Sequence, residues 1–455
     1  MDSQRPVFVA GICGTFMAGI AQIATQMGRT VSGCDEGVYP PMSSLLHSLG
    51  IRTLQGYDPN HLPNDDRTDV LIGNALSRGN PLVEATLERK LAYLSAPEWL
   101  KHNVLRNRMV VAVAGTHGKT STSSMIAWIL ARAGFEPGYL IGGKPGNFDT
   151  SAALGSGPQF VIEADEYDTA FFDKRSKFVH YLPSVAVLNN LEFDHADIFA
   201  DLEQIKTQFH HLLRIVPPGG HVVVNVDEPN LQSVLNRGCW SQVTRFSRQS
   251  ETADWSVTPL QDDFSSFSID RFGQPVGRVE WSSFGSHNMM NALAAVATSS
   301  ICGVDPAIAC EALAEFSHPS RRLQLIYDNN DVTVYEDFAH HPTAIFETLS
   351  ALRHRHPGRN LIAILEPRSN TMRAGVHGDK IHESLTIADQ VLIYASEIGG
   401  KQSIPDDYDQ PMFRHRDSLV EETVSSLIGN DVVVLMSNGS FDEVPSTLVA
   451  RLKTK

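Results

Sequence analysis

The sequence predicts an α/β protein of three domains, and three observations lead to this expectation. The 455 residues make about three domains at roughly 150 residues each. Short apolar runs alternate with helical patterns towards both ends of the chain, which is typical of parallel, doubly wound sheets. Between them, a strand, a glycine-containing loop and a helix follow one another as in phosphate-binding proteins. We therefore expect a Rossmann-like N-terminal domain, a P-loop ATPase-type central domain and a Rossmann-like C-terminal domain.

The N-terminal domain is expected over residues 1–107. Apolar runs and helical spacing alternate in it. They predict strands at Val7–Ala10, Thr30–Gly33 and Val70–Gly73, and helices at Phe16–Met27, Ser43–Leu49 and Leu82–Arg89. The polar, basic stretch Lys101–Arg108 is interpreted as a linker to the next domain.

The central domain is expected over residues 108–319 and the C-terminal domain over residues 320–455. Central strands are predicted at Met109–Ala114, Phe160–Ile162, Val185–Leu188 and His221–Val226, followed by a β-rich region over 240–284 and a helix over Asn288–Ser300. C-terminal strands are predicted at Val332–Tyr335, Leu361–Leu365, Gln390–Tyr394 and Val432–Met436. Residues from all three domains carry candidate sites, so domain closure on binding is expected.

Composition and charge exclude several classes of protein. Hydrophobic residues make up 42% of the chain and charged residues 20%, which is ordinary globular usage. The net charge of −15 argues against a nucleic-acid binder, although local cations can still bind a small anionic substrate.

The lengths of the apolar runs and the number of cysteines predict the location and the redox chemistry of the protein. The chain has no apolar run long enough to span a membrane, and its first apolar run is too short for a signal peptide, so a cytoplasmic protein without membrane insertion is expected. Its five cysteines are scattered and suggest neither a disulfide framework nor a cysteine-based zinc site.

The strongest motif is the loop that follows the strand Met109–Ala114. It reads Gly115, Thr116, His117, Gly118, Lys119 and Thr120. Backbone N–H groups at a helix start hold phosphate, the lysine neutralises its charge, and the threonine hydroxyl can ligate Mg²⁺. Val113 stands where the common P-loop has its first glycine, so this loop is a tighter variant. The alternative is a chance turn, but the strand–loop–helix context favours phosphate binding.

Acidic and histidine side chains follow two further central strands. The run Glu163–Asp168 comes after Phe160–Ile162 and offers the oxygen ligands that Mg²⁺ prefers, with Glu163 the chief candidate. The alternative is a solvated acidic turn. His195 follows the strand Val185–Leu188 within the run Asn189–His195, and it is either a metal ligand or a capped loop histidine.

The first strand ends in a glycine-rich turn that only loosely matches a dinucleotide-binding fingerprint. The pattern places glycines at positions 11, 13 and 16, whereas this chain has Gly11, Cys13 and Phe16. A standard NAD site is therefore doubtful. A diphosphate could still bind the helix start at Gly14 and Thr15. Asp35 could then reach a ribose or base. The alternative is a turn without a ligand.

The remaining candidates lie in and near the C-terminal domain. They are Asp337, His340 and His341 at a strand end, the cations Arg368 and Arg373, the helix start at His287, Asn288 and Asn291, and the boundary pair Arg321 and Arg322. Strand ends of open α/β sheets commonly bind ligands. Ordinary surface, hinge and capping roles are the alternatives for each of these groups.

Taken in order along the chain, these motifs resemble the Mur ligase family, the ATP-dependent amide-forming enzymes of peptidoglycan synthesis. Within the family, four segments resemble the murein-recycling enzymes: Asp165–Phe178, Asn190–Phe199, Glu366–Met372 and Met436–Gly439. That resemblance implies a ligase joining the tripeptide L-Ala-γ-D-Glu-meso-diaminopimelate to UDP-N-acetylmuramate through an acyl phosphate. The same-family alternative adds free L-alanine. An NAD-dependent oxidoreductase and a nucleotide-switched binding module are the rivals outside the family.

The resemblance also implies roles for the candidates, with ATP and Mg²⁺ as cofactors. The catalytic set would be Lys119, His195, Arg321, Asp337, His340 and His341. ATP would contact Gly115, Thr116, His117, Gly118, Lys119, Thr120, His287, Asn288, Asn291, Arg321 and Asp337. Thr120 and Glu163 would hold one Mg²⁺ and His195 a second. The UDP-sugar would meet Gly11, Cys13, Gly14, Thr15, Phe16 and Asp35, and the peptide carboxylates Arg368 or Arg373. His340 or His341 would orient the incoming amine. No lysine is assigned the carbamylated, metal-bridging role seen in other members, and no protein partner is indicated.

Overall fold

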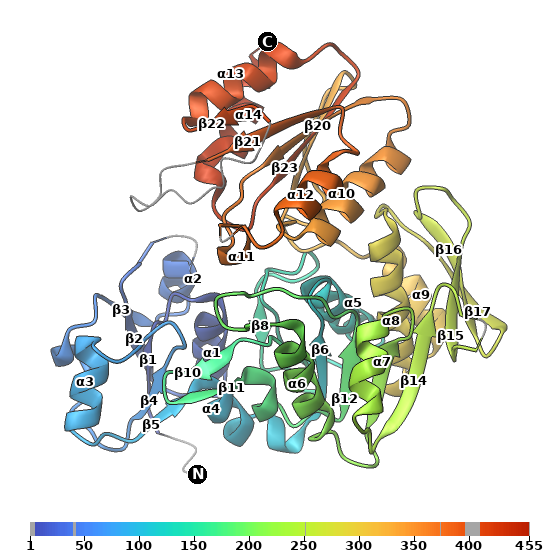
Figure 1. Cartoon of the computed structure of the whole chain (residues 1–455). Helices are drawn as coiled ribbons and strands as arrows, with labels where there is room; N and C mark the ends of the chain where they lie inside the picture. Colours follow the sequence, from blue (N-terminus) through green and yellow to red (C-terminus); the bar gives the residue numbers. More distant parts are fainter. Residues whose placement is uncertain (1–4, 40–41, 251, 374, 396–409, 455) are drawn as a thin grey trace.

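The computed structural model describes residues 5–39, 42–250, 252–373, 375–395 and 410–454. Its main strands form three sheets, each from one continuous stretch of the chain (Figure 1). The mixed α/β class and the predominantly parallel sheets confirm the predicted fold class. No helix within the described residues is long and apolar enough to cross a membrane.

The first sheet is wholly parallel, with strand order β3-β2-β1-β4-β5. Its strands are β1 (Val7–Ala10), β2 (Val31–Asp35), β3 (Arg52–Gln55), β4 (Asp69–Ile72) and β5 (Tyr93–Ser95), and its helices are α1 (Thr15–Gln26), α2 (Met42–Ser48), α3 (Pro81–Glu88) and α4 (Ala96–Asn103). Alternate β1 residues face opposite layers: Val7 and Val9 pack with α1 and α4, Phe8 and Ala10 with α3. The strand order reverses at β1, the position where open α/β sheets bind ligands.

The linker predicted over Lys101–Arg108 was wrong, because α4 runs to Asn103 and a 3₁₀ turn covers Leu105–Asn107. The Ser95 hydroxyl accepts a hydrogen bond from the Glu98 N–H and caps the helix start. Trp99, on the inner side of this helix, is fully buried. The polar residues that suggested a linker are the outer side of an amphipathic segment.

The central sheet has strand order β17-β16-β15-β14-β13-β12-β6-β9-β7-β8. Its strands are β6 (Met109–Ala114), β7 (Gly138–Leu140), β8 (Ala152–Ala153), β9 (Gln159–Glu163), β12 (Val185–Leu188), β13 (His221–Asn225), β14 (Gln242–Ser247), β15 (Trp255–Pro259), β16 (Ser266–Arg271) and β17 (Gln274–Glu280). A separate ribbon pairs β10 (Asp168–Ala170) with β11 (Asp173–Ser176). The predicted strands Met109–Ala114 and Val185–Leu188 and the β-rich region are confirmed.

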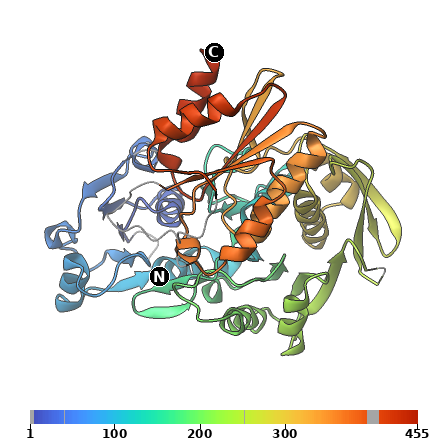
Figure 2. The ribbon, with the colours of Figure 1, turned by 45° about the horizontal axis from the view of Figure 1, so that its top comes forward.

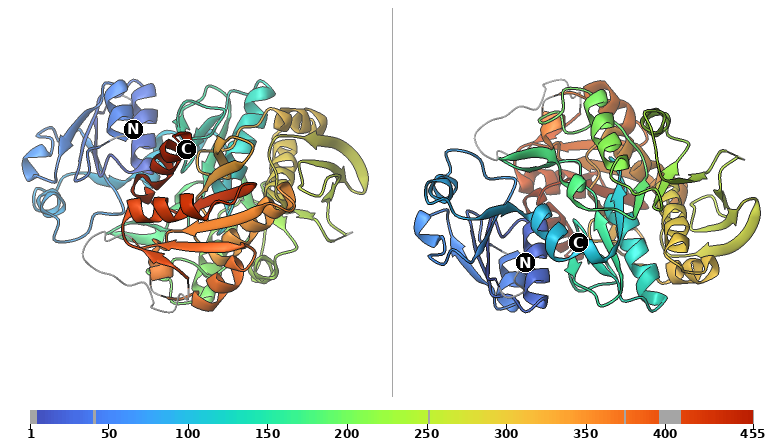
Figure 3. Two further views of the ribbon diagram at one scale, coloured as in Figure 1. Left: turned by 90° about the horizontal axis from the view of Figure 1, so that it is seen from above. Right: turned by 90° about the horizontal axis from the view of Figure 1, so that it is seen from below.

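Helices cover both faces of the central sheet. Helices α5 (Lys119–Arg132), α8 (Ser286–Ile301) and α9 (Pro306–Ala314) pack on one face, and α6 (Leu202–Leu213) and α7 (Pro229–Asn236) on the other. The second face also receives α1 of the N-terminal sheet. Figure 3 shows the N-terminal sheet, in blue, and strands β15–β17, in yellow, at opposite ends of the molecule.

The third sheet has strand order β18-β19-β23-β20-β21-β22, and only β18 runs antiparallel to its neighbour. Its elements are β18 (Gln324–Asp328), β19 (Val332–Asp337), β20 (Asn360–Leu365), β21 (Gln390–Tyr394), β22 (Met412–Phe413), β23 (Asp431–Met436), α10 (Pro342–Arg355), α11 (Asn370–Arg373), α12 (Gly378–Leu385), α13 (Arg416–Ser426) and α14 (Val444–Lys453). Helices α10 and α12 cover one face, α13 and α14 the other. Figure 1 shows this domain, orange to red, above the central domain, and in Figure 2 it lies in front of it.

Candidate active site

The loop between β6 and α5 is shaped by two glycines with positive φ. Gly115 has φ 152° and Gly118 has φ 75°, a left-handed conformation that side chains disfavour. A Cβ atom on Gly118 would also lie 2.4 Å from Oδ1 of Asn291. Helix α5 begins at Lys119, so the loop ends at the first-turn N–H groups of the helix, which have no partner within it. The expected anion-binding geometry is therefore present.

A cavity of about 470 Å³ lies beside this loop. It is lined by sequence-predicted residues from the central and C-terminal domains: Thr116, His117, Gly118, Lys119, Thr120, Glu163, His195, His287, Asn288, Asn291, Asp337 and His340. The structure thus brings most of the predicted nucleotide, metal and catalytic residues to one place.

Lys119 forms an ion pair with an acidic residue outside the predicted set. Its Nζ lies 2.9 Å from Oε2 of Glu166, whose other oxygen lies 3.2 Å from Nε2 of His195. The Tyr167 hydroxyl is 2.7 Å from Nδ1 of the same histidine. Burial disfavours the charged form of Glu166, but its contacts with Lys119 and His195 together outweigh burial and lower its pKa to about 2. Glu166 stands in the predicted acidic run, and only the fold shows that it faces Lys119.

The charge on the two partners of Glu166 is favoured in the same way. Burial opposes the ammonium of Lys119, but the adjacent Glu166 raises its pKa above the ordinary value. Burial likewise opposes protonation of His195, and its contact with Glu166 raises its pKa. Both nitrogens of His195 are engaged, so binding a metal ion would require it to release Tyr167 or Glu166.

Thr120 and Glu163 form the second polar group beside the loop. The Thr120 hydroxyl donates to Oε1 of Glu163 at 3.1 Å, and the Gly142 N–H donates to Oε2 at 2.7 Å. Burial raises the pKa of Glu163 despite the opposing charge of Lys119. The carboxylate is thus incompletely compensated, and it lies beside a hydroxyl oxygen. This donor set fits Mg²⁺, which would stabilise the buried anion.

The neighbouring arginines Arg321 and Arg322 point to different places. Arg321, the residue predicted to contact ATP, forms a 2.7 Å ion pair with Glu336 and donates to the Ser437 carbonyl. Arg322 lines the cavity, with Nη2 3.5 Å from the Thr120 hydroxyl. The sequence indicated the pair, but not which member faces the loop.

Residues at the start of α8 lie beside the loop and helix α5. Asn288 donates to the Phe284 carbonyl at 2.9 Å, and Oδ1 of Asn291 accepts from the Thr122 hydroxyl at 3.1 Å. Nδ1 of His287 lies 3.7 Å from a carboxylate oxygen of Glu347. Gly285 is the N-cap of α8 and no side chain caps the helix start, so the capping interpretation is not borne out. All three residues line the cavity, and their predicted ATP contact stays a prediction.

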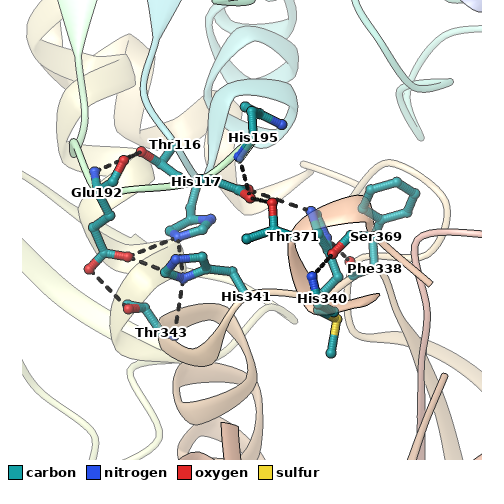
Figure 4. A network of polar contacts seen from close by, with 12 residues as sticks. Thr116, His117, Glu192, His195, Phe338, His340, His341, Thr343, Ser369 and Thr371 are labelled. Atoms are coloured by element: carbon teal, nitrogen blue, oxygen red, sulfur yellow. Dashed lines mark hydrogen bonds and ion pairs between the residues drawn. The ribbon is translucent and has the colours of Figure 1, made fainter. Parts of the chain in front are cut away.

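A histidine–carboxylate cluster connects the central and C-terminal domains (Figure 4). Nε2 of His117 lies 3.1 Å from Oε2 of Glu192 and 3.1 Å from Nδ1 of His341. The Thr343 hydroxyl donates to the other oxygen of Glu192 at 2.9 Å. Burial opposes the charged form of Glu192, yet contact with His117 lowers its pKa to about 2. Glu192 was not predicted as a site residue.

His340 has a different environment from its neighbour His341. Its Nδ1 lies 2.9 Å from the Phe338 carbonyl, so this nitrogen carries the donated proton in the neutral ring. Its Nε2 lies 3.9 Å from Asp194, whose other oxygen accepts from Thr371 at 2.9 Å. Burial lowers the pKa of His340 to about 4. The residue is therefore neutral near pH 7, with an unprotonated nitrogen.

A smaller cavity of about 220 Å³ adjoins the first. Both cavities are lined by Tyr167, Asp194, His195, His340 and Asn438. Arg368 lines the smaller one, and its guanidinium contacts Ser440 at 3.3 Å and Glu366 at 3.8 Å. Arg373 ends α11 and does not line either cavity.

The N-terminal turn holds its predicted residues together around Asp35. The Cys13 N–H donates to Oδ2 of Asp35 at 2.8 Å and the Gly37 N–H to Oδ1 at 3.0 Å. Gly14 caps α1 without a side-chain bond, so the N–H groups that begin at Thr15 stay open. Both carboxylate oxygens of Asp35 therefore hold the turn, and its predicted contact with a ribose or base stays a prediction.

A cation from the central domain reaches this turn. Lys177 Nζ lies 5.6 Å from the ring centroid of Phe16, 5.7 Å from that of Tyr167, and 3.3 Å from Asp165. The Lys177 side chain is 11% exposed, so its charge is directed towards the junction of the two domains. It was not among the predicted binding residues.

Three family models match the chain in order. They are the Mur ligase family catalytic domain over residues 8–108, the Mur ligase middle domain over 113–299 and the Mur ligase glutamate ligase domain over 321–439. The chain belongs to the Mur ligase family. The family expectation from the sequence motifs is confirmed.

Individual relatives distinguish branches of the Mur ligase family. The chain is 49% identical to the UDP-N-acetylmuramate–L-alanyl-γ-D-glutamyl-meso-2,6-diaminoheptandioate ligase of Escherichia coli (strain K12), over 99% of this chain and 98% of the relative. A solved murein peptide ligase mpl from Psychrobacter arcticus 273-4 matches with a TM-score of 0.77 and 40% identity, covering 99% of both chains. The UDP-N-acetylmuramate–L-alanine ligase of Aquifex aeolicus (strain VF5) is 33% identical over 78% of this chain and 76% of the relative.

Proposed function

We propose that this Mur ligase uses ATP to join L-Ala-γ-D-Glu-meso-diaminopimelate to the lactyl carboxylate of UDP-N-acetylmuramate. The observation that carries this proposal is the 49% identity over almost the whole chain to a ligase named for that tripeptide. The L-alanine ligase is less similar, at 33% over 78% of the chain. The second cavity beyond His340 gives a longer amine substrate a place to extend. Because ATP and nucleotide sugars are cytoplasmic metabolites, the proposed reaction is cytoplasmic.

The proposal divides the substrates among three domains, with boundaries at 1–107, 108–319 and 320–455. The N-terminal turn and Lys177 receive the anionic UDP-sugar. The loop before α5 receives the ATP phosphates, with Lys119 neutralising the transferred group. Arg322, which lines the cavity 3.5 Å from the Thr120 hydroxyl, supplies the cation that the sequence assigned to Arg321.

Thr120 and Glu163 would hold Mg²⁺, because they bring a hydroxyl and a buried, undercompensated carboxylate together. Bound Mg²⁺ supplies charge neutralisation at the phosphates. The chain itself orients the reactants: Lys119 and Arg322 offset negative charge as the carboxylate oxygen bonds to the γ-phosphorus, the bond from that phosphorus to the bridging oxygen breaks, and ADP leaves. Glu166 holds the Lys119 side chain in place at 2.9 Å. Positioning and electrostatics of this kind contribute most of the catalysis in such transfers.

The second step needs a group that accepts a proton from the tripeptide amine. The amine nitrogen attacks the acyl carbon, the C–O bond to phosphate breaks, and phosphate leaves with the electron pair. Nε2 of His340 is unprotonated, and the ring lines both cavities, so it can accept the amine proton. His341 is committed to His117, Glu192 and the Phe193 carbonyl. Of the two predicted histidines, His340 is therefore the proposed acceptor of the amine proton.

Arg368 is the proposed partner for a peptide carboxylate in the smaller cavity. The cavity also presents Ser369 and Asn438, which can hydrogen-bond an extended peptide. Arg373 lines neither cavity and is a weaker candidate for that contact.

Peptide-dependent ADP release tests the proposed function. The purified chain is given ATP, Mg²⁺ and UDP-N-acetylmuramate with either the tripeptide or L-alanine. The proposal expects release with the tripeptide and little with L-alanine, and mass spectrometry should find the UDP-N-acetylmuramoyl tripeptide. Equal or greater turnover with L-alanine alone would contradict the proposal and favour the L-alanine-adding activity.

A further inference from the structure

The His117–Glu192–His341 cluster has the dimensions of a metal site. The three facing atoms are His117 Nε2, Glu192 Oε2 and His341 Nδ1, and they are 3.1, 3.1 and 3.2 Å apart. Zn²⁺ binds nitrogen and oxygen at about 2.0–2.1 Å, so neighbouring ligands of a tetrahedral site lie about 3.3–3.4 Å apart. The observed triangle therefore needs only small side-chain movements to become one face of that tetrahedron.

Hydrogen bonding leaves an unprotonated nitrogen aimed at this triangle. Nε2 of His341 faces the Phe193 carbonyl at 3.3 Å, and a carbonyl can only accept, so that nitrogen carries the proton. Nδ1 is 3.3 Å from the Thr343 N–H, which likewise requires a lone pair on Nδ1. The same atom lies 3.2 Å from the Glu192 carboxylate, a second acceptor. In the metal-free protein the single lone pair of Nδ1 accepts from the Thr343 N–H, and Nε2 of His117 faces both Nδ1 and Glu192 as the remaining donor. A cation bound in the triangle would take the place of these protons.

Contacts behind two of the three side chains, His341 and Glu192, match those around known metal ligands. A ligating histidine usually donates its other ring N–H to a carbonyl or carboxylate, and a ligating carboxylate is itself hydrogen-bonded. The Phe193 carbonyl faces the outer nitrogen of His341 in this manner. The Thr343 hydroxyl holds the outer oxygen of Glu192 at 2.9 Å. Both ligand orientations are therefore set by the protein.

We propose that His117, Glu192 and His341 form a binding site for a zinc-class transition-metal ion, separate from the Thr120–Glu163 site. Two imidazoles and one carboxylate suit Zn²⁺, whereas Mg²⁺ prefers oxygen ligands. His117 and Glu192 line the large cavity, so a fourth ligand position opens towards it. His341 caps α10 of the C-terminal domain, so the bound ion joins that domain to the nucleotide loop. The inference does not depend on the ligase activity.

Zinc binding to the full chain tests this site. Protein stripped with a chelator is titrated with Zn²⁺ against a chromogenic chelator, in excess Mg²⁺ and without substrates. One Zn²⁺ per chain is expected. His341→Gln and Glu192→Gln should each weaken binding at least about tenfold, while the neighbouring variant His340→Gln should bind Zn²⁺ as the unmodified chain does.

Two results would overturn the site. One is unchanged Zn²⁺ affinity in His341→Gln, and the other is loss of binding in His195→Gln alone, which assigns the ion to the Glu166 cluster. Circular dichroism and thermal unfolding without metal show whether each variant is folded. Because a variant can fail to fold, Co²⁺ is also added to the unmodified chain. Four-coordinate visible bands without thiolate charge transfer are expected, and a weak six-coordinate spectrum contradicts the proposal.

Discussion

Two turns in this molecule share a backbone design but obtain positive charge differently. In both, a buried strand ends in a glycine with positive φ, Gly11 after β1 and Gly115 after β6, and a helix follows within a few residues. The central loop carries its own cation, Lys119, held by Glu166 at 2.9 Å. The N-terminal turn instead lies beside Lys177, which comes from the central domain. Helix N–H groups alone therefore do not define an anion site, because the cation can come from elsewhere in the chain.

Removing Lys119 should give the largest effect. Lys119→Ala deletes the charge opposite the ATP phosphates, and we expect ligation to fall by about a hundredfold to a thousandfold, as for other electrostatic catalytic groups. ADP release measures the loss. Because the change leaves Glu166 buried without its partner, the double variant Lys119→Ala/Glu166→Gln serves as the control for folding. Ligation close to the unmodified rate in a folded variant would remove the phosphate role from the loop.

Replacing a loop glycine with alanine tests how strongly the backbone conformation of each turn is constrained. Gly118→Ala combines φ 75° with a Cβ that would meet Asn291 at 2.4 Å, so about 1–3 kcal/mol of strain is expected. The matched change Gly14→Ala has no positive φ, and its nearest contact is 3.5 Å. Chemical unfolding and the KM for ATP should change in the first variant and much less in the second. Equal effects would mean that the two turns are constrained alike.

Removing Lys177 tests whether this cation of the central domain serves the N-terminal turn. Lys177→Ala should raise the KM for UDP-N-acetylmuramate about tenfold, equivalent to about 1.4 kcal/mol, with the KM for ATP unchanged. Lys174→Ala is the matched control, because Lys174 is 70% exposed and pairs with Asp168 on the outer ribbon. Initial rates with each substrate varied separately give both constants. A selective rise in the KM for ATP would contradict the assignment of Lys177 to the sugar nucleotide.

Acid titration of stability should give the smallest effect. Glu166 has a pKa of about 2 when folded and about 4.5 ordinarily, so the unfolded state binds more protons between these values. Its stabilising contribution is present above about pH 4.5 and is lost as the pH falls towards 2. Between pH 5.5 and 4 the loss should be about 1 kcal/mol. Urea unfolding of Glu166→Gln should show a shallower pH slope than the unmodified chain, and parallel slopes would count against the Lys119–Glu166 pair.

Local patterns sufficed for most of the fold and for the central loop. The strands Val7–Ala10 and Met109–Ala114 could be placed because apolar runs bounded by turns are a local signal, and Lys119 could be placed because it stands inside its own motif. Lys101–Arg108 misled because polarity on one side of a helix resembles a linker.

The missed site residues depend on contacts between distant segments. Glu166 meets Lys119 from a different strand end, and Glu192 meets His341 from a different domain. Both adjacent arginines lie over the Phe338 ring, yet Arg321 pairs with Glu336 and Arg322 faces Thr120. Lys177 contributes to a turn 161 positions away from it in the chain, next to Phe16. Spacing within a motif carries no information about such partners.

The close packing of α1 bears on how the chain folds. A Cβ atom on Gly19 would lie 2.4 Å from the Leu140 side chain and 3.1 Å from Ala152, so helix and central sheet share one continuous apolar core. The C-terminal domain instead has apolar clusters on both faces of its sheet, and Phe284 is the central-domain residue that joins one of them. The shared core leads us to expect two units of folding cooperativity from the three predicted domains. The first two should fold and unfold together, and the third retains the independence that motion against them requires.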